Sequence, residues 1–194
     1  MKKSIFALLL VSAIAVCPVL AQTVTDTITK KTSRTVVQTP GTTPAPAAAG
    51  GSMAPDFNVT SIDGKVFDSK ALRGKVIVLN LWFINCPFCI QEIAMLNPIV
   101  DQNRDKDVVF IGLSINTRSQ LESFLKTRPF KYNQVAGAGQ LMLMKFGEVG
   151  KGGNIDLKFP LHIVIDREGK QVLRKQGVEG VDMVRQELEK QFKK

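Results

Sequence analysis

Hydrophobic residues are concentrated in two nearly continuous runs in the middle of the chain. The first, VIVLNLWF, spans residues 76–83, and the second, VVFIGLSI, spans residues 108–115. Unbroken apolar runs are typical of strands that are buried on both faces of a sheet, whereas half-exposed strands alternate. The pattern therefore predicts two buried strands, and we expect residues 76–83 to be central in the sheet.

Segments with helical character follow the buried strands. The first is expected to begin at Asn85, a candidate N-cap, with Pro87 in a first turn where its missing N–H had no intrahelical partner. This helix should run roughly to Asn97. The last helix, residues 181–192, is amphipathic, because its apolar residues fall on one side. Two further helices are expected at residues 119–126 and, in part, at residues 141–146.

Shorter apolar runs on either side of turn residues predict two hairpins. One pairs residues 57–62 with 65–68, and the other pairs LHIVID (residues 161–166) with KQVLRKQG (residues 170–177). A strand–helix–strand unit followed by a hairpin and a helix gives an α/β domain with a mixed central sheet. The first hairpin precedes this unit as an N-terminal addition.

The first residues have the layout of a secretory signal peptide, MKKSIFALLLVSAIAVCPVLAQ. Two lysines precede an apolar run that is too short for a comfortable transmembrane helix, and small residues end at Ala21. We therefore expect residues 1–21 to be removed and the protein to be periplasmic or otherwise exported. An uncleaved membrane anchor remains an alternative, as does a lipoprotein acylated at Cys17, although Val16 is bulky for lipoprotein processing.

Residues 22–52 are rich in Thr, Pro, Ala and Gly and end in QTPGTTPAPAAAGGS. Such a segment buries too little apolar surface to offset its ordering entropy, so a flexible linker is predicted. The alternating stretch TVTDTITKKTSRTVV leaves a short added strand as an alternative. One compact domain is expected at residues 53–194.

The chain is basic, with 26 Lys and Arg against 17 Asp and Glu and a formal net charge of +9. A basic balance is compatible with nucleic acid or acidic partners. Here the basic residues are scattered and the chain is expected to be exported, so we interpret them as a solvated surface and expect no nucleic acid partner.

The stretch WFINCPFCIQEI contains Cys86 and Cys89, the two cysteines that remain after the leader. A cysteine at the start of a helix is close to unpaired N–H groups, which favour the thiolate. The spacing suits thiol–disulfide exchange, in which one exposed sulfur attacks a partner and the second releases it, with Pro87 stiffening the turn and Phe88 adding bulk. A zinc site needs four ligands, and two cysteines with His162 do not supply them, so no metal is expected. An inert structural disulfide remains an alternative.

These motifs together resemble the thioredoxin superfamily. The resemblance rests on WFINCPFC at the end of a buried strand, APDF upstream and FPLHIVIDREGK downstream. The opening MAPDFNVTSIDGKVFDSKALRGKVIVLNLWF is similar to the TlpA-like branch of exported thiol-disulfide oxidoreductases, which includes the ResA and DsbE types. The resemblance covers residue 53 to the C-terminus. It implies a thioredoxin fold, a reversible Cys86–Cys89 disulfide with Cys86 as nucleophile and Cys89 as resolving cysteine, and a cis proline at Pro160 that leaves backbone free for a substrate.

The resemblance also implies a role for Glu92, which falls where this branch carries an acidic residue. A partly buried carboxyl there could accept or return the proton of Cys89, and the alternative is a solvated glutamate on the helix face. In thioredoxin the buried acid lies on the strand before the motif, where this chain has Asn80. An asparagine cannot shuttle a proton, so the role would fall to Glu92.

Aromatic residues surround the predicted site. Trp82 resembles the tryptophan beneath the active site of the family, whereas Phe83, Asn85 and Phe88 depart from the commoner small or polar neighbours. Phe88 and Phe159 could form an apolar landing surface for a peptide, and packing is an equal alternative. The lone His162, two positions after Pro160, is interpreted as structural rather than as part of the site.

The expected function is an exported thiol-disulfide oxidoreductase without a cofactor, acting as a monomer. It would receive electrons from a membrane thiol donor and reduce disulfides of exported proteins, and cytochrome c maturation is the role that the resemblance suggests. Residues 131–158 form a central insertion that could select the partner. The alternatives are a peroxiredoxin-like peroxidase, although residues 80–83 lack the usual Pro and Thr, and a non-enzymatic module with a stable disulfide.

Overall fold

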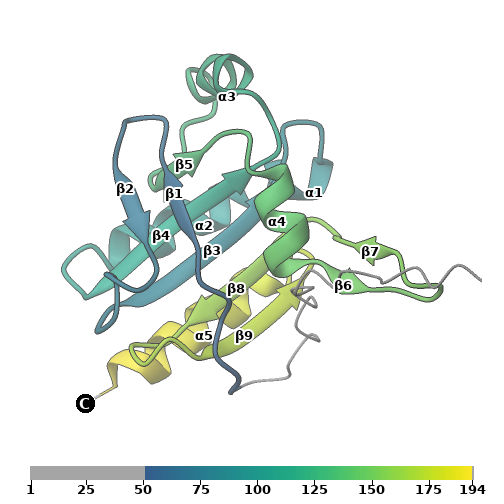
Figure 1. Cartoon of the computed structure of the whole chain (residues 1–194). Coiled ribbons are helices and arrows are strands. Elements are labelled where there is room, and N and C mark those ends of the chain that lie inside the picture. Colours follow the sequence, from purple (N-terminus) through teal and green to yellow (C-terminus); the bar gives the residue numbers. More distant parts are fainter. Residues whose placement is uncertain (1–50, 194) are drawn as a thin grey trace, which may run out of the picture. The chain divides into compact units, whose positions relative to one another are not determined.

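The computed structural model describes residues 51–193 (Figure 1). The predicted signal peptide and residues 22–50 of the predicted linker lie outside this range. The strands are β1 (Asn58–Thr60), β2 (Val66–Asp68), β3 (Val76–Trp82), β4 (Val108–Ser114), β5 (Asn133–Val135), β6 (Glu148–Val149), β7 (Ile155–Asp156), β8 (Leu161–Ile165) and β9 (Gln171–Gln176). The helices are α1 (Pro87–Gln91), α2 (Ile93–Gln102), α3 (Arg118–Leu125), α4 (Gly139–Phe146) and α5 (Gly180–Phe192).

Five strands form the central sheet in the order β5-β4-β3-β8-β9. Strand β3 runs parallel to β4 and antiparallel to β8, so the sheet is mixed. All seven residues of β3 are buried, as the unbroken apolar run predicts. The register pairs Asn80 on β3 with His162 on β8, which brings these two polar residues side by side. The predicted α/β class with a central β3 is confirmed.

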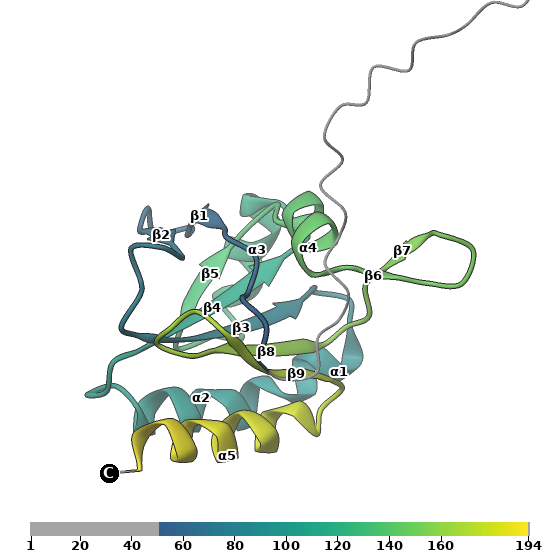
Figure 2. The same ribbon diagram turned by 60° about the horizontal axis from the view of Figure 1, so that its bottom comes forward.

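The side chains of β3 alternate between two apolar cores. Val76 and Val78 pack with residues of α2 and α5, whereas Ile77 and Leu79 pack with the β1–β2 hairpin and α4. Figures 1 and 2 show the corresponding layers, with α2 and α5 along one face of the sheet and α4 with β1 and β2 on the other. Both faces are covered, which explains why this strand needs no polar face.

The predicted N-terminal hairpin is present as β1 and β2, which pair antiparallel with Val59 opposite Phe67. Gly64 lies in the turn between them with φ 84°, a conformation that glycine adopts without steric cost. Both Val59 and Phe67 are buried against the central sheet. The hairpin therefore closes one face of the core.

The helical segment after β3 differs from the prediction at both ends. Cys86, rather than Asn85, is the N-cap, because its side chain accepts the Cys89 N–H while its own backbone is extended. A break at Glu92 divides the segment into α1 and α2, and α2 continues to Gln102. Pro98 removes one backbone donor from α2, but burial of the residues that follow it keeps the helix intact. Within residues 51–193, none of the helices is long and apolar enough to cross a membrane.

The predicted insertion, residues 131–158, contains several elements. Strand β5 joins the sheet parallel to β4, and helix α4 packs on the core. Strands β6 and β7 form a separate antiparallel hairpin. This hairpin projects from the domain in both views (Figures 1 and 2).

Candidate active site

Cys86 and Cys89 form a disulfide where the chain leaves β3 and enters α1. Their Cα atoms are 5.2 Å apart, and the Cys86 Sγ atom accepts the backbone N–H of Cys89 at 3.1 Å. A donor aimed at sulfur favours the charged form of that sulfur once the bond is reduced. Of the two cysteines, Cys86 is therefore the one whose sulfur accepts a backbone N–H.

Both cysteines are covered in this disulfide form. Cys86 is 4% exposed and Cys89 is 1% exposed, in a cluster with Trp82 and Leu121. The sequence-based picture of an openly exposed attacking sulfur is therefore wrong for the oxidised protein. Instead, Phe88 between the cysteines is 61% exposed, so an aromatic ring lies at the surface beside a nearly covered sulfur.

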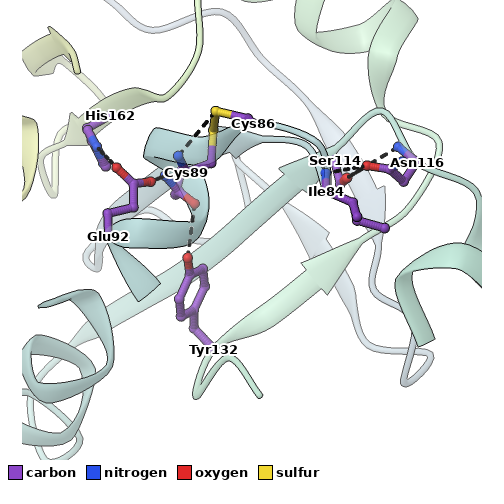
Figure 3. Close-up of a disulfide and its surroundings, with 9 residues drawn as sticks. Ile84, Cys86, Cys89, Glu92, Ser114, Asn116, Tyr132 and His162 are labelled. Atoms are coloured by element: carbon purple, nitrogen blue, oxygen red, sulfur yellow. Dashed lines mark hydrogen bonds and ion pairs between the residues drawn. A yellow bond between two sulfur atoms is a disulfide. The ribbon is translucent and has the colours of Figure 1, made fainter. Parts of the chain in front are cut away.

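Glu92 lies three positions after Cys89 and is fully buried, which rules out the alternative of a solvated glutamate. Its Oε1 atom accepts the Asn80 side-chain N–H at 2.7 Å, and its Oε2 atom lies 3.0 Å from the His162 Nε2 atom (Figure 3). Residues three apart on a helical segment share a face, so the carboxyl and Cys89 are neighbours. The arrangement places a titratable group behind the buried cysteine.

Tyr132 extends this polar network from the opposite side. Its hydroxyl donates to the Asn80 Oδ1 atom at 2.9 Å, so Asn80 accepts from Tyr132 and donates to Glu92 (Figure 3). Burial of the phenol, followed by the negative charge of Glu92, raises the pKa of Tyr132 well above its ordinary value. Tyr132 therefore remains a protonated donor, and Asn80 has a fixed orientation.

The peptide bond between Phe159 and Pro160 is cis, at the residue that precedes β8. The Phe159 ring packs edge-on against Phe83, with ring centroids 5.2 Å apart. Of the two aromatic residues predicted as a landing surface, Phe159 is therefore half-buried and packed, whereas Phe88 is exposed.

Trp82 and Ile84 anchor the segment that leads to the cysteines. Trp82 is fully buried at the end of β3, and its indole N–H donates to the Gln134 Oε1 atom at 3.0 Å. The backbone N–H of Ile84 donates to the side-chain oxygen of Asn116 at 2.9 Å (Figure 3). Asn85, which follows, is exposed and makes no cap.

Three residues of this site were not predicted to belong to it: His162, Tyr132 and Asn116. Each reaches the site across a long separation in the chain, and Glu92 and His162 are 70 residues apart. A polar residue inside an apolar strand run is the signal that marks both Asn80 and His162. That signal identifies a buried polar group, but it does not identify its partner.

Comparisons with known proteins agree with this geometry. Residues 51–173 match the model of the AhpC/TSA family. The thiol-disulfide oxidoreductase ResA of Bacillus thuringiensis subsp. konkukian is 27% identical over 145 residues, which cover 74% of this chain and 77% of that protein. The soluble secreted antigen MPT53 of Mycobacterium tuberculosis is 35% identical over 80 residues, which cover 40% of this chain and 42% of that protein.

A solved structure shows the same fold. The thiol:disulfide interchange protein of Chlorobium tepidum TLS superimposes with a TM-score of 0.57 at 24% identity, covering 73% of this chain and 98% of that one. The predicted thioredoxin-like fold and the predicted resemblance are thus confirmed. The chain belongs to the AhpC/TSA family of thioredoxin-fold proteins, in which it is a thiol-disulfide oxidoreductase of the ResA type.

Proposed function

We propose that this protein is an exported reductase that transfers two electrons from the Cys86–Cys89 pair to disulfides of exported proteins. The observation that carries the proposal is the position of the cysteine pair one helical turn before the fully buried carboxyl of Glu92. The leader-like first residues support export, as does the similarity to a soluble secreted antigen. The similarity to ResA supports the chemistry.

In the first step, the Cys86 thiolate attacks one sulfur of the partner disulfide. A mixed disulfide forms between Cys86 and the partner, the partner disulfide breaks, and the other partner sulfur leaves as a thiolate. The Cys89 N–H that points at the Cys86 sulfur favours the attacking thiolate. Pro160, which immediately precedes β8, would border the backbone of the partner segment, because proline offers no N–H to a ladder.

In the second step, Cys89 resolves the mixed disulfide. Its thiol gives a proton to Glu92, the resulting thiolate attacks the Cys86 sulfur, and the second partner sulfur leaves. The partner has gained two electrons, and the protein returns to the disulfide form. The proton then passes from Glu92 to solvent or to the departing thiolate. Glu92 is the candidate for this role because its carboxyl is the titratable group next to buried Cys89.

A membrane thiol donor would re-reduce the cysteine pair, and the protein would act as a monomer. The similarity to ResA makes proteins of cytochrome c maturation one class of acceptor to test. Residues 131–158 are the candidate for partner selection, because their β6–β7 hairpin projects from the domain (Figure 2).

The deciding experiment measures the reduction potential of the Cys86–Cys89 pair against glutathione or dithiothreitol buffers. A value near or below about −270 mV agrees with a reductase, whereas a value near about −120 mV would make the protein an oxidant. Cys89→Ser should trap a mixed disulfide on Cys86, and Cys86→Ser should trap none. A pair that does not titrate reversibly would leave only a structural disulfide, and peroxide consumption without disulfide exchange would indicate a peroxidase.

A further inference from the structure

His162, interpreted from the sequence as structural, contacts Glu92. Both side chains are fully buried, and the His162 Nε2 atom lies 3.0 Å from the Glu92 Oε2 atom. The other ring nitrogen, Nδ1, is also buried and has no hydrogen-bond partner within residues 51–193. Of the two ring nitrogens, only Nε2 therefore has a hydrogen-bond partner among these residues, and that partner is the Glu92 carboxyl.

The unpartnered Nδ1 atom indicates which tautomer is present. A buried N–H without an acceptor costs the desolvation of a donor, whereas a bare ring nitrogen avoids that cost. The hydrogen of a neutral imidazole is therefore favoured on Nε2, where it donates to Glu92. A doubly protonated ring would again leave an N–H of Nδ1 buried without an acceptor.

The Asn80 end of the network supplies a second donor to Glu92. Tyr132 donates to the Asn80 oxygen, so the Asn80 nitrogen must be the atom that donates to the Glu92 Oε1 atom. Each carboxyl oxygen of Glu92 thus receives one neutral donor. Hydrogen bonds to the charged form of a carboxyl favour that form.

The ring of His162 is held in this orientation by the first turn of α5. A Cβ atom added at Gly180 would lie 2.2 Å from the His162 Cδ2 atom, so helix backbone packs directly on the ring. The titratable groups around the pair are Cys86 and Cys89 on the α1 side and Tyr132 beyond Asn80. On the remaining sides, Lys175 lies opposite His162 on β9 and exposed Glu179 precedes Gly180.

We propose that His162 is a positioning residue whose neutral Nε2–H keeps Glu92 ionised, so that Glu92 can take the proton of Cys89. This inference rests on the role proposed above for Glu92 and adds the group that makes the role effective. Without the donor, Glu92 would bind its own proton at higher pH and would not accept one from Cys89. His162 thereby sets the lower pH limit of the resolving step.

The test follows the two steps separately in the reduced full-length protein with dithiobis-nitrobenzoate. Attack by Cys86 releases one coloured thiolate and leaves a mixed disulfide, and attack by Cys89 releases the second thiolate and restores the Cys86–Cys89 bond. Stopped-flow absorbance resolves the two phases, and the second phase is measured as a function of pH. The wild type should show a second phase that falls toward acidic pH.

His162→Leu removes the donor with a side chain of similar volume. The pH at which the rate of the second phase decreases should then be higher, and this phase should be about tenfold slower at neutral pH. The first phase should change less than about twofold, because it does not use Glu92. His162→Gln supplies an amide N–H to the same oxygen and should keep the second phase within about threefold of wild type. His162→Met is a second donor-free variant if His162→Leu does not fold.

Ile163→Val is the matched control, because Ile163 is fully buried on the opposite face of β8 and does not touch the network. It should lower stability without moving the pH profile. The proposal is overturned if the donor-free variants keep the wild-type profile, or if His162→Gln behaves like His162→Leu. A second phase that is unchanged in Glu92→Gln would instead refute the role of Glu92 itself.

Discussion

The side-chain oxygen of Asn116 accepts the backbone N–H of Ile84 at 2.9 Å. Asn116 lies in the loop between β4 and α3, and its oxygen also lies 3.1 Å from the Ser114 hydroxyl, which donates to it. The segment that carries the cysteines is therefore tied, just after β3, to the loop that follows the neighbouring strand. This tie restricts where Cys86 can lie relative to the sheet.

Removing this acceptor should destabilise the protein. Asn116→Ala leaves the Ile84 N–H in a partly buried position without its partner, and we expect a loss of about 1–2 kcal/mol in the free energy of unfolding. Urea denaturation measures this change. Asn116→Asp keeps an oxygen at the same place and should lose less. Equal losses in the two variants would contradict the importance of the acceptor.

Replacing Glu92 by glutamine tests proton transfer. Glu92→Gln keeps an oxygen for the Asn80 N–H but cannot take a proton, so the resolving step should slow by about 100-fold or more at neutral pH. Two-phase kinetics with an aromatic disulfide measure it. Glu122→Gln is the matched control, because Glu122 is an exposed glutamate on α3 paired with Arg118. Similar kinetics in both variants would contradict a catalytic Glu92.

Phe88 and Phe159 should have different effects when replaced. Phe88 is 61% exposed, so Phe88→Ser should change the free energy of unfolding by less than about 0.5 kcal/mol. Loss of an aromatic contact should raise KM for a disulfide-containing protein about tenfold, and the change for a small disulfide should be smaller.

Phe159 is the packed member of this pair, since its ring lies edge-on against Phe83. Phe159→Ala should therefore cost about 2 kcal/mol of stability. Thermal unfolding separates the two variants. A stability loss in Phe88→Ser, or an unchanged KM for the protein substrate, would show that Phe88 is not a landing surface.

Gly180 leaves no room for a side chain. In Gly180→Ala the new methyl group would lie 2.2 Å from the His162 ring, so α5 or the ring must shift. We expect a net loss of about 1–3 kcal/mol, although alanine is the better helix former. The control is Gly139→Ala in α4, where the nearest atom would be Ile115 Cγ2 at 3.4 Å. That variant should be neutral or slightly more stable in urea denaturation.

The titration of Asp101 should lower the free energy of unfolding at acidic pH. A hydrogen bond from Lys131, followed by one from Arg104, lowers the pKa of Asp101 in the folded protein. The contribution of Asp101 to the free energy of unfolding is thus complete above its pKa in the unfolded chain, about 3.9. It is lost as pH falls toward the lower pKa of the folded protein.

Asp101→Asn should therefore destabilise the protein near neutral pH, and its difference from wild type should shrink below about pH 4. Urea denaturation at several pH values measures this. Asp107→Asn is the control, because the Asp107–Lys75 pair is exposed and should contribute little. A difference for Asp101→Asn that does not vary with pH would exclude its titration as the cause.

The elements that depend on local pattern could be predicted from the sequence. The unbroken run of β3 indicates a strand covered on both faces. The spacing of Cys86 and Cys89 suits thiol–disulfide exchange, and together with the family resemblance it indicates redox chemistry. The start of α1 was placed one residue early, at Asn85, because a side-chain cap by a cysteine sulfur is not expected from helix statistics.

The polar network could not be predicted in the same way. His162 meets Glu92 only because β8 pairs antiparallel with β3 in the register that sets Asn80 opposite His162. Tyr132 reaches Asn80 from 52 residues away, from the first residues of the predicted insertion. These contacts depend on strand register, which a short local pattern does not encode.

The complete burial of β3 affects how the domain resists a force that a covalently bound partner applies at Cys86. We expect the amides of this strand to exchange with solvent mainly when the whole domain opens, because buried core strands are the most protected class of element. Cys86 follows this strand by a few residues, so a partner joined to Cys86 by a mixed disulfide would pull on a segment that continues directly from the buried strand. We therefore expect the covalent intermediate to be attached beside one of the best protected strands of the domain.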